Sequence, residues 1–472
     1  MISGICALLI ACGGGGGGSG GGTNPPGSGG NNPPPTAGTC NIESEKQFVL
    51  DVARSWYLFL DLLPTNVDTA QYPTADALLD ALTAQARRQS RDRYFSYLTS
   101  ITAEEQYFEQ GESVGFGFSV TVPTSQLRLF VTDVYAGSGA AEAGFQRGDE
   151  LLAVGASVND LQPVSQLLVQ PNGWQAAIGP SQSGITRVFR VRTRDGAVID
   201  RTATKRPFSL DPVPRTALIE REGLTPVGYV SLRSFIQPAN EALVAAFASF
   251  RARNVSDVII DLRYNGGGLL STADLLVNLL SGARRDTDIE FQIQHNALHK
   301  DRDEVVFFSP HPSAVQADRI VFLVTDASAS ASEMVINSLA PYADVALVGE
   351  RTYGKPVGQY AFDLEGCDTR LRLVTFKLTN RDGYGDYYTG LPPNPPDTRF
   401  AESFCSAADD LMSDPGDPDE AMTGEALFWL ANGSCSDAVS GIARATLSEE
   451  RPAPEPFLHR PAPLEVYLPG AL

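Results

Sequence analysis

Two apolar runs and one helical stretch alternate with turns of small residues between positions 321 and 359 of this 472-residue chain. Residues 321–325 are rich in β-branched side chains, which predicts a buried strand, and residues 331–340 carry apolar side chains at helical spacing. Residues 343–349 predict a second strand. Strands that alternate with helices are typical of a largely parallel α/β sheet, so we expect an α/β core that contains both intervening turns.

The first turn places alternating serines between the strand and the helix. A serine there is exposed at the end of the sheet, where N–H groups of the first helical turn point outward without an intrahelical partner. Such donors can hold an oxyanion. The turn alone leaves a second interpretation open, because Ser330 and Glu333 also form an S-x-x-E capping box ahead of an apolar helix.

The second turn carries a lone lysine, Lys355. Consecutive strands usually neighbour each other, so Lys355 can return to the serine turn. Lysine acts as a general base only when neutral, and its ordinary pKa of about 10.4 keeps it charged at neutral pH. We expect burial to lower this pKa, with Tyr353, Val357, Leu347 and Val348 as the apolar neighbours. The alternative is an exposed loop lysine.

Three motifs now stand in order: SASASE at 328–333, GERTYGK at 349–355 and the glutamine at 359. They resemble the C-terminal processing, or tail-specific, peptidases, which are serine proteases of the S41 group with a Ser–Lys dyad. The resemblance implies that Ser330 is the nucleophile, Lys355 the base and Gln359 the residue that orients the lysine. It implies structural roles for Ser328 and Ser332.

A glycine-rich turn, DLRYNGGG at 261–268, follows a strand predicted at 258–262 and is similar to the family's D-L-R-x-N-x-G-G. Glycine lets the backbone approach a reacting carbonyl and presents N–H groups without a side chain in the way. We choose the N–H groups of Gly267 and Ala331 as the oxyanion hole. The alternative for the triple glycine is a plain flexible turn.

Residues 104–207 resemble a PDZ domain. The GFGF segment, Gly115, Phe116, Gly117 and Phe118, is similar to the carboxylate-binding loop of that domain, and SGAAEAGFQRGDE at 138–150 is similar to a second PDZ motif. A PDZ groove binds a peptide as an added strand. The resemblance implies that the two phenylalanines line the pocket and that 118–122 is the pairing edge. The alternative is a strand-edge turn with core aromatics. The stretch 171–184 is predicted to be a longer loop than the family needs.

The first residues, 1–12, form an apolar segment too short to span a bilayer. Its end, LIAC, is similar to the lipobox of bacterial lipoproteins, which implies lipidation of Cys12. A signal should begin with positive charge, and residues 1–8 contain neither lysine nor arginine, which favours a true start upstream of Met1. The Gly/Pro-rich residues after it predict a flexible tether, with a cell-wall spacer or secretion linker as alternatives.

The resemblance implies a Clp/crotonase-like α/β protease core with an inserted or preceding PDZ-like β domain, and the sequence adds an N-terminal helical segment. The segments are as follows: 1–12 lipoprotein signal, 13–41 linker, 42–103 helical region, 104–207 PDZ-like domain, 208–439 catalytic domain and 440–472 proline-rich tail.

Four cysteines lie outside the signal: Cys40, Cys367, Cys405 and Cys435. An even number in an exported chain predicts two disulfides with three connectivities. Of these we prefer Cys367 with Cys405 and Cys40 with Cys435.

The net charge of −20 argues against nucleic acid and against electrostatic attachment to anionic membranes, and it mildly favours basic substrates. His295 and His299 have the i, i+4 spacing of a metal pair, but no third ligand is evident. We interpret both as exposed loop residues and expect neither metal nor cofactor.

The sequence therefore predicts a serine endopeptidase of the bacterial cell envelope, lipid-anchored on a periplasmic or extracellular face, that acts on protein or peptide C-terminal segments. The oligomeric state is left open. Two alternatives remain: a catalytically inactive PDZ adaptor on a protease scaffold, and a hydrolase of non-peptide amides or esters.

Overall fold

The computed structural model describes residues 40–122, 127–170, 172–393 and 403–436. The predicted signal with Cys12, nearly all of the linker and the predicted tail at 440–472 lie outside the described residues. Among the helices in the described ranges, none combines the length and the apolar character needed to cross a bilayer.

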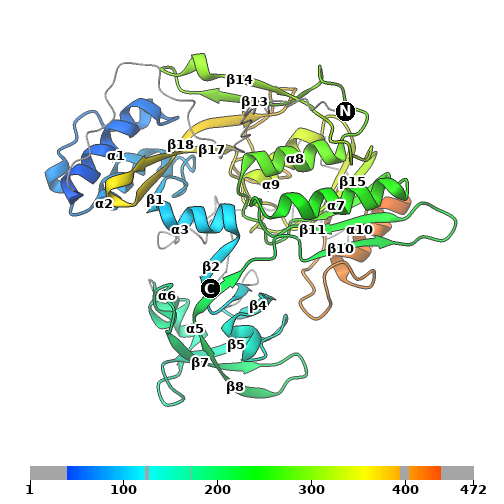
Figure 1. Ribbon diagram of the computed structural model, residues 1–472, viewed down its shortest axis with the longest axis horizontal. Coiled ribbons are helices and arrows are strands. Elements are labelled where there is room, and N and C mark those ends of the chain that lie inside the picture. Colours follow the sequence, from blue (N-terminus) through cyan, green and yellow to red (C-terminus); the bar gives the residue numbers. More distant parts are fainter. Residues whose placement is uncertain (1–39, 123–126, 171, 394–402, 437–472) are drawn as a thin grey trace, which may run out of the picture.

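The core is a six-stranded sheet (Figure 1). Its strands pair in parallel except for the first two, which are antiparallel. In spatial order they are β10 (Arg215–Ile219), β11 (Val227–Ser231), β12 (Asp257–Asp261), β15 (Arg319–Val324), β16 (Asp344–Gly349) and β19 (Phe404–Ser406).

Helices cover both faces of this sheet. Val258 and Ile260 of β12 pack in the cluster formed with α7 (Ala239–Ala252), α8 (Leu270–Leu280) and α9 (Ala331–Leu339). Ile259, which points the other way, packs with α10 (Ala421–Asn432). A sheet buried on both faces needs strands that are apolar throughout, and this explains the unbroken apolar runs in the sequence. The predicted α/β core is confirmed.

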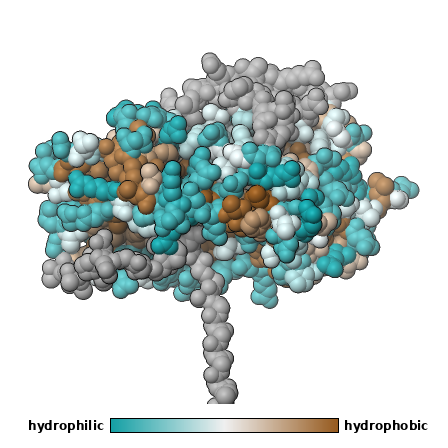
Figure 2. Space-filling model, turned by 90° about the horizontal axis from the view of Figure 1, so that it is seen from above, coloured by the Kyte–Doolittle hydropathy of each residue, from teal (hydrophilic) through white to brown (hydrophobic). Residues whose placement is uncertain are grey.

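A second, antiparallel sheet lies beside the core. It contains β1 (Tyr97–Ser100), β13 (Ile289–His295), β14 (Glu304–Phe307), β17 (Val357–Leu364) and β18 (Thr369–Thr379). The helices α1 (Ile42–Trp56) and α2 (Ala75–Arg88) pack on this sheet through Leu371, Leu373 and Val374 of β18. The predicted N-terminal helices are therefore confirmed, and β1 joins that region to this sheet by pairing with β18. Viewed from above this sheet, the surface is mostly hydrophilic with separate hydrophobic patches (Figure 2).

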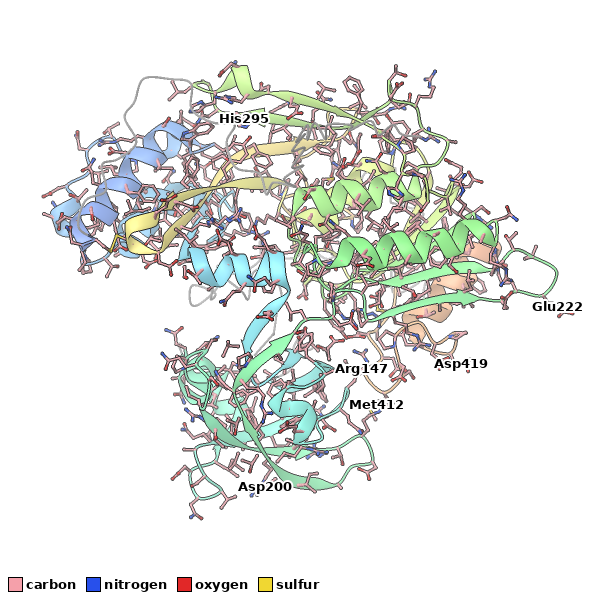
Figure 3. The ribbon with its side chains drawn as sticks, in the orientation of Figure 1. Arg147, Asp200, Glu222, His295, Met412 and Asp419 are labelled. Carbon is pink, nitrogen blue, oxygen red and sulfur yellow. A yellow bond between two sulfur atoms is a disulfide. The ribbon has the colours of Figure 1, made fainter. Side chains whose placement is uncertain are left out.

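The two histidines are not exposed loop residues, so that interpretation was wrong. His295 ends β13 with 8% of its surface exposed, and its Nε2 lies 2.9 Å from the Tyr360 hydroxyl (Figure 3). The His299 ring stacks on Trp56 of α1, with ring centroids 3.6 Å apart. The two rings therefore have separate protein partners, one in β17 and one in α1, which the sequence spacing could not show.

A third sheet forms the lower lobe in Figure 1 and corresponds to the segment compared with PDZ domains. Its strands are β3 (Phe118–Thr121), β4 (Leu129–Val134), β5 (Glu150–Gly155), β6 (Gln162–Pro163), β7 (Thr186–Arg192) and β8 (Val198–Thr204), and its short helices are α4 (Gly139–Glu142), α5 (Val164–Leu167) and α6 (Gly173–Ile178). The stretch 171–184 is thus not simply a long loop. It contains α6, which buries Trp174 and Ile178.

This lobe is joined to the rest of the protein by a short ribbon and by side-chain contacts. The ribbon of β2 (Glu112–Gly115) and β9 (Arg206–Ser209) leads into it, close to the predicted boundaries. Arg147 of the lobe donates to the Tyr264 hydroxyl at 3.1 Å and pairs with Asp409 at 3.1 Å (Figure 3). The lobe is therefore packed against the core rather than only tethered to it.

Both disulfides differ from the preferred pairing, which was wrong. Cys40 pairs with Cys367, and Cys405 pairs with Cys435. Cys367 lies in the β17–β18 turn beside the start of α1, whereas Cys405 lies in β19 of the core sheet and packs against α10. The pairing depends on which distant segments pack together, and this could not be read from the sequence.

Candidate active site

Ser330 occupies a sharp turn between β15 and α9. Its φ of 57° and ψ of −111° are strained for a residue with a side chain. The neighbouring serines hold this turn. Ser328 Oγ donates to the Leu262 carbonyl at 2.7 Å, and Ser332 Oγ donates to the Asn265 carbonyl at 2.9 Å. The structural roles predicted for Ser328 and Ser332 are confirmed, and Ser330 remains half-buried at the surface of a pocket.

Glu333, the third residue of α9, connects the serine turn to the lysine loop. Its buried carboxylate accepts hydrogen bonds from the N–H groups of Ser330 at 2.9 Å, Gly354 at 2.7 Å and Lys355 at 2.8 Å, and from the Thr352 hydroxyl at 2.5 Å. Burial raises the pKa of Glu333, and these hydrogen bonds oppose the rise. The sequence motif suggested only a helix cap at this position.

Lys355 is buried, with 2% of its surface exposed. The pKa of Lys355 is lowered to about 7, mainly by burial and also by the nearby Arg372, while the carboxylates of Asp92 and Glu333 oppose the shift. Its Nζ donates to Gln359 Oε1 at 2.6 Å, which confirms the expected contact between these two residues. A lysine with this pKa is about half neutral at pH 7, and a general base must be neutral.

The N-terminal region completes the surroundings of the lysine, which sequence reasoning missed. The Phe95 ring lies 5.2 Å from Lys355 Nζ, and the Phe95 carbonyl accepts a hydrogen bond from the Gln359 side chain. Arg93 donates to the carbonyls of Tyr353 at 2.9 Å and Gly354 at 2.6 Å. No local signal near Lys355 could have identified partners this far away along the chain.

The glycine turn lies against the serine, as expected, but one detail differs. A Cβ atom at Gly267, whose φ is +111°, would come within 2.9 Å of Ser330 Cβ, so only glycine fits there. The Gly267 N–H, however, donates to Asn265 Oδ1 at 2.9 Å. The choice of Gly267 as an oxyanion donor is therefore not supported by this geometry. Its neighbour Gly268 lines the pocket together with Ala331.

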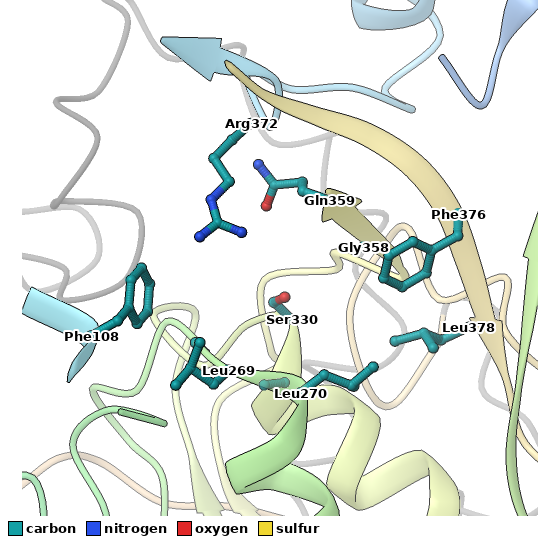
Figure 4. A pocket seen from close by; sticks show the side chains of 11 residues that line it. Phe108, Leu269, Leu270, Ser330, Gly358, Gln359, Arg372, Phe376 and Leu378 are labelled. Carbon is teal, nitrogen blue, oxygen red and sulfur yellow. The ribbon is translucent and has the colours of Figure 1, made fainter. Parts of the chain in front are cut away.

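The pocket beside Ser330 is mainly apolar (Figure 4). Its side walls come from α8, β17, β18 and the segment before β2. Gly358 is needed for its shape, because a Cβ atom there would lie 2.0 Å from the Phe376 ring. The residues that line it are Phe108, Gly268, Leu269, Leu270, Ser330, Ala331, Gly358, Gln359, Arg372, Phe376 and Leu378.

The phenylalanines of the GFGF segment do not line an open groove, so their predicted role was wrong. Phe116 and Phe118 are fully buried and pack on Phe145 and Phe189. The carbonyl of Phe116 accepts from the Ala140 N–H, and that of Gly117 accepts from Tyr135 and Ser138. Gly115 pairs with Arg206 in the connecting ribbon. Among the strands in the described part of the chain, β3 ends its sheet and pairs only with β4, so residues 118–121 form a strand edge there.

Comparison with known proteins agrees with this arrangement. Residues 226–394 match peptidase family S41, and residues 44–97 match the peptidase S41 N-terminal domain. The chain is 27% identical over 273 residues to the carboxyl-terminal-processing protease of Synechocystis sp., covering 56% of this chain and 60% of that protein. It is 24% identical over 329 residues to the carboxy-terminal processing protease CtpA of Bacillus subtilis, covering 69% and 65%. The chain thus spans less than two thirds of the length of these curated relatives.

A solved structure shows the same fold. A Bacteroides fragilis protein assigned to the S41 proteases superposes with a TM-score of 0.63 at 24% identity, covering 82% of this chain and 97% of that one. The two sequence matches cover the N-terminal helices and the core that carries Ser330, Lys355 and Gln359. Residues 226–394, which carry Ser330, Lys355 and Gln359, therefore form a region similar to peptidase family S41, and residues 44–97 are similar to the N-terminal domain of that family.

Proposed function

We propose that this chain is a serine endopeptidase that cleaves proteins or peptides by acyl transfer through Ser330 and Lys355. The observation that carries the proposal is the buried Lys355, whose pKa is lowered to about 7 and whose Nζ is held by Gln359. A neutral amine that donates to Gln359 keeps a lone pair with which it can accept the Ser330 proton.

In the proposed reaction these groups act in two stages. Lys355 Nζ takes the proton from Ser330 Oγ, and this oxygen attacks the carbonyl carbon of the substrate. The tetrahedral oxyanion accepts hydrogen bonds from the Ala331 N–H and from a backbone N–H of the glycine turn at 266–268. The intermediate collapses, and the leaving amine takes the proton from Lys355. Water, activated by the same lysine, hydrolyses the acyl ester and frees Ser330. No step needs a metal or a cofactor.

We infer that the substrates are C-terminal segments of proteins or peptides. The names of the curated relatives support this, since they are carboxyl-terminal-processing proteases. A role for the PDZ-like lobe in holding such a segment is supported by β3, whose edge position suits addition of a strand. The buried phenylalanines leave the backbone of this edge, rather than Phe116 and Phe118, as the element for recognition.

We infer that the protein works in the bacterial cell envelope, on the periplasmic or extracellular side. The two disulfides support an oxidising compartment. Attachment through a lipid on Cys12 remains a proposal based on the LIAC segment.

The alternative of an inactive PDZ adaptor is less well supported. An adaptor has no use for a buried lysine and a strained serine whose backbones are joined through Glu333, and burying a lysine destabilises a fold. Hydrolysis of non-peptide amides or esters would use the same groups, so a substrate panel distinguishes it from peptidase activity.

The test compares the wild type, Ser330→Ala and Lys355→Ala on an unstructured protein substrate. We expect both variants to lose at least about a thousandfold in kcat/KM. Lys300→Ala, which removes an exposed lysine far from the pocket in the sequence, serves as a control that keeps activity. Equal cleavage by all four proteins would exclude the dyad, and equal absence of cleavage would favour the adaptor.

A further inference from the structure

One charged side chain lines the pocket beside Ser330. Of the described residues around this pocket, Arg372 alone is charged, and the others are glycine, alanine, large apolar residues, Ser330 and Gln359. In Figure 4 the Arg372 guanidinium points into the pocket from the side opposite Leu270, towards Ser330 and Gln359. A substrate group that enters the pocket therefore meets one positive charge among mostly apolar neighbours.

Arg372 is held in this place by a defined contact. It lies on β18, and its Nε and Nη2 atoms lie 2.5 Å from Glu104 Oε1. Glu104 is buried on α3 (Ile101–Glu105) and also lies 3.7 Å from Arg370 Nη1. The contact with Glu104 engages one edge of the guanidinium and fixes its plane. A planar guanidinium fixed in this way is suited to bind a carboxylate through paired hydrogen bonds.

The local charge differs from that of the whole molecule. The net charge of −20 favours basic substrates at long range, but solvent screens charges that lie beyond about 10 Å. Inside a half-buried apolar pocket the effective dielectric constant is lower, so the nearest charge has the larger effect. Arg372 should therefore decide which groups fit beside Ser330, whatever the overall field attracts.

We propose that Arg372 makes the subsite beside Ser330 select a substrate carboxylate and reject a substrate ammonium group. The inference rests on the peptidase function proposed above. The carboxylate has two sources, an aspartate or glutamate side chain next to the cleaved bond, or the free C-terminus of a substrate cleaved close to its end. Both present the same planar anion to the guanidinium.

The experiment measures kcat/KM for a peptide series with wild type and three variants. Each peptide carries Glu, Gln or Lys in turn at one of the four positions nearest the cleaved bond, with the C-terminus amidated. Two further peptides have Gln at all four positions and end two residues after the cleaved bond. One ends in a free carboxylate and the other in an amide. The variants are Arg372→Gln, Arg372→Lys and the matched control Arg370→Gln, which alters the same Glu104 cluster without lining the pocket.

For each variant, the ratio of kcat/KM between two peptides is measured at one pH. Replacing Arg372 also changes the pKa of Lys355, but that change alters the rate for every peptide by the same factor and cancels in the ratio. In the wild type we expect Glu over Gln, and Gln over Lys, by about tenfold at one position or more, or the free acid over the amide by a similar factor. Arg372→Gln should remove this preference. Arg372→Lys, which keeps the charge but loses the paired hydrogen bonds, should keep only part of it, and Arg370→Gln should keep most of it. The position or terminus that responds identifies the source of the carboxylate.

The inference would be overturned if the wild type had the same kcat/KM for the Glu, Gln and Lys peptides and also the same kcat/KM for the free-acid and amide peptides. A preference that survives in Arg372→Gln would do the same. In either case cleavage of the Gln peptide by the wild type, absent in Ser330→Ala, leaves the peptidase function standing. If the wild type cleaves no peptide in the series and no unstructured protein, both proposals fail together. Thermal unfolding of each variant shows whether a lost rate reflects a lost fold.

Discussion

Glu333 Oε2 accepts a hydrogen bond from the backbone N–H of Lys355 at 2.8 Å, and the same oxygen accepts the N–H of Ser330 at 2.9 Å. One carboxylate oxygen therefore sets the separation between the backbones of the two residues assigned to the dyad. The other oxygen binds Thr352 and the Gly354 N–H, so the whole lysine loop is fastened to the first turn of α9.

Glu333→Gln should damage both stability and activity. The amide keeps one acceptor oxygen but replaces the other with an NH2 group, which is a donor. This NH2 group then faces two donors that have lost their acceptor. We expect unfolding free energy to fall by about 3 kcal/mol and kcat/KM to fall about a hundredfold. Urea unfolding and peptide hydrolysis measure the two effects. Glu241→Gln is the control, because Glu241 is also the third residue of its helix but is exposed; equal behaviour of the two variants would contradict this role.

Phe95→Leu should move the pH profile rather than abolish activity. The Phe95 ring helps to exclude water from Lys355, and desolvation is the main cause of its lowered pKa. A smaller side chain admits water and raises that pKa, so the acid limb of kcat/KM should shift upward by about one pH unit while the rate at high pH changes less. Phe59→Leu alters the same N-terminal apolar cluster and should leave the midpoint in place. An unmoved midpoint in Phe95→Leu would show that this ring does not tune the lysine.

Replacement of Lys355 should stabilise the protein in a defined pH window. The pKa of Lys355 is about 7 in the folded state and 10.5 in its ordinary state. Between these values the unfolded chain binds the proton and the folded chain does not, so stability rises with pH by about 1.4 kcal/mol per unit, and below pH 7 the cost of burying the ammonium is complete. Lys355→Met lacks this cost.

The difference in unfolding free energy between Lys355→Met and the wild type should therefore be largest at pH 7 and below and should vanish towards pH 10.5. The other titrating groups contribute equally to the unfolding free energies of the two proteins, so their contributions cancel in the difference. Lys300→Met, at an exposed site, should show no such trend. A pH-independent difference would mean that the lysine is solvated in the folded protein.

The two disulfides should contribute unequally. The Cys40–Cys367 bond closes a sequence separation of 327 residues, whereas Cys405–Cys435 closes 30. In the chain-entropy account, loss of the first should cost about 2 kcal/mol more than loss of the second. Paired Cys→Ser variants, unfolded in urea without reductant, measure both. A larger loss from the Cys405–Cys435 pair would indicate that local strain or packing, rather than chain entropy, governs these bonds.

The sequence predicted those parts of the site that are local in the chain. The strand before Ser330, the helix after it, the glycine turn and the contact between Lys355 and Gln359 each follow from short-range pattern or from the family resemblance, and the structure contains all of them. What could not be predicted depends on contacts between distant segments. Phe95 reaches Lys355 from the N-terminal region, and Arg372 enters the pocket from β18.

The errors have the same origin. The GFGF motif fixed a turn but could not show that Phe116 and Phe118 would meet Phe189 in the interior of the lobe. Likewise His299 became a stacking partner because α1 docks on its hairpin. Spacing along the chain reports which residues can share a face, and only the packing of elements decides what covers that face.

The rate at which Ser330 is labelled by a peptidyl phosphonate, measured against pH, tests the central claim that Lys355 is its base. The account predicts one modified residue, Ser330, identified by mass spectrometry. The labelling rate should rise with a midpoint near pH 7, following the lowered pKa of Lys355, and should fall by at least about a hundredfold in Lys355→Ala. Labelling at another residue, or an equal rate and pH profile in Lys355→Ala, would contradict it.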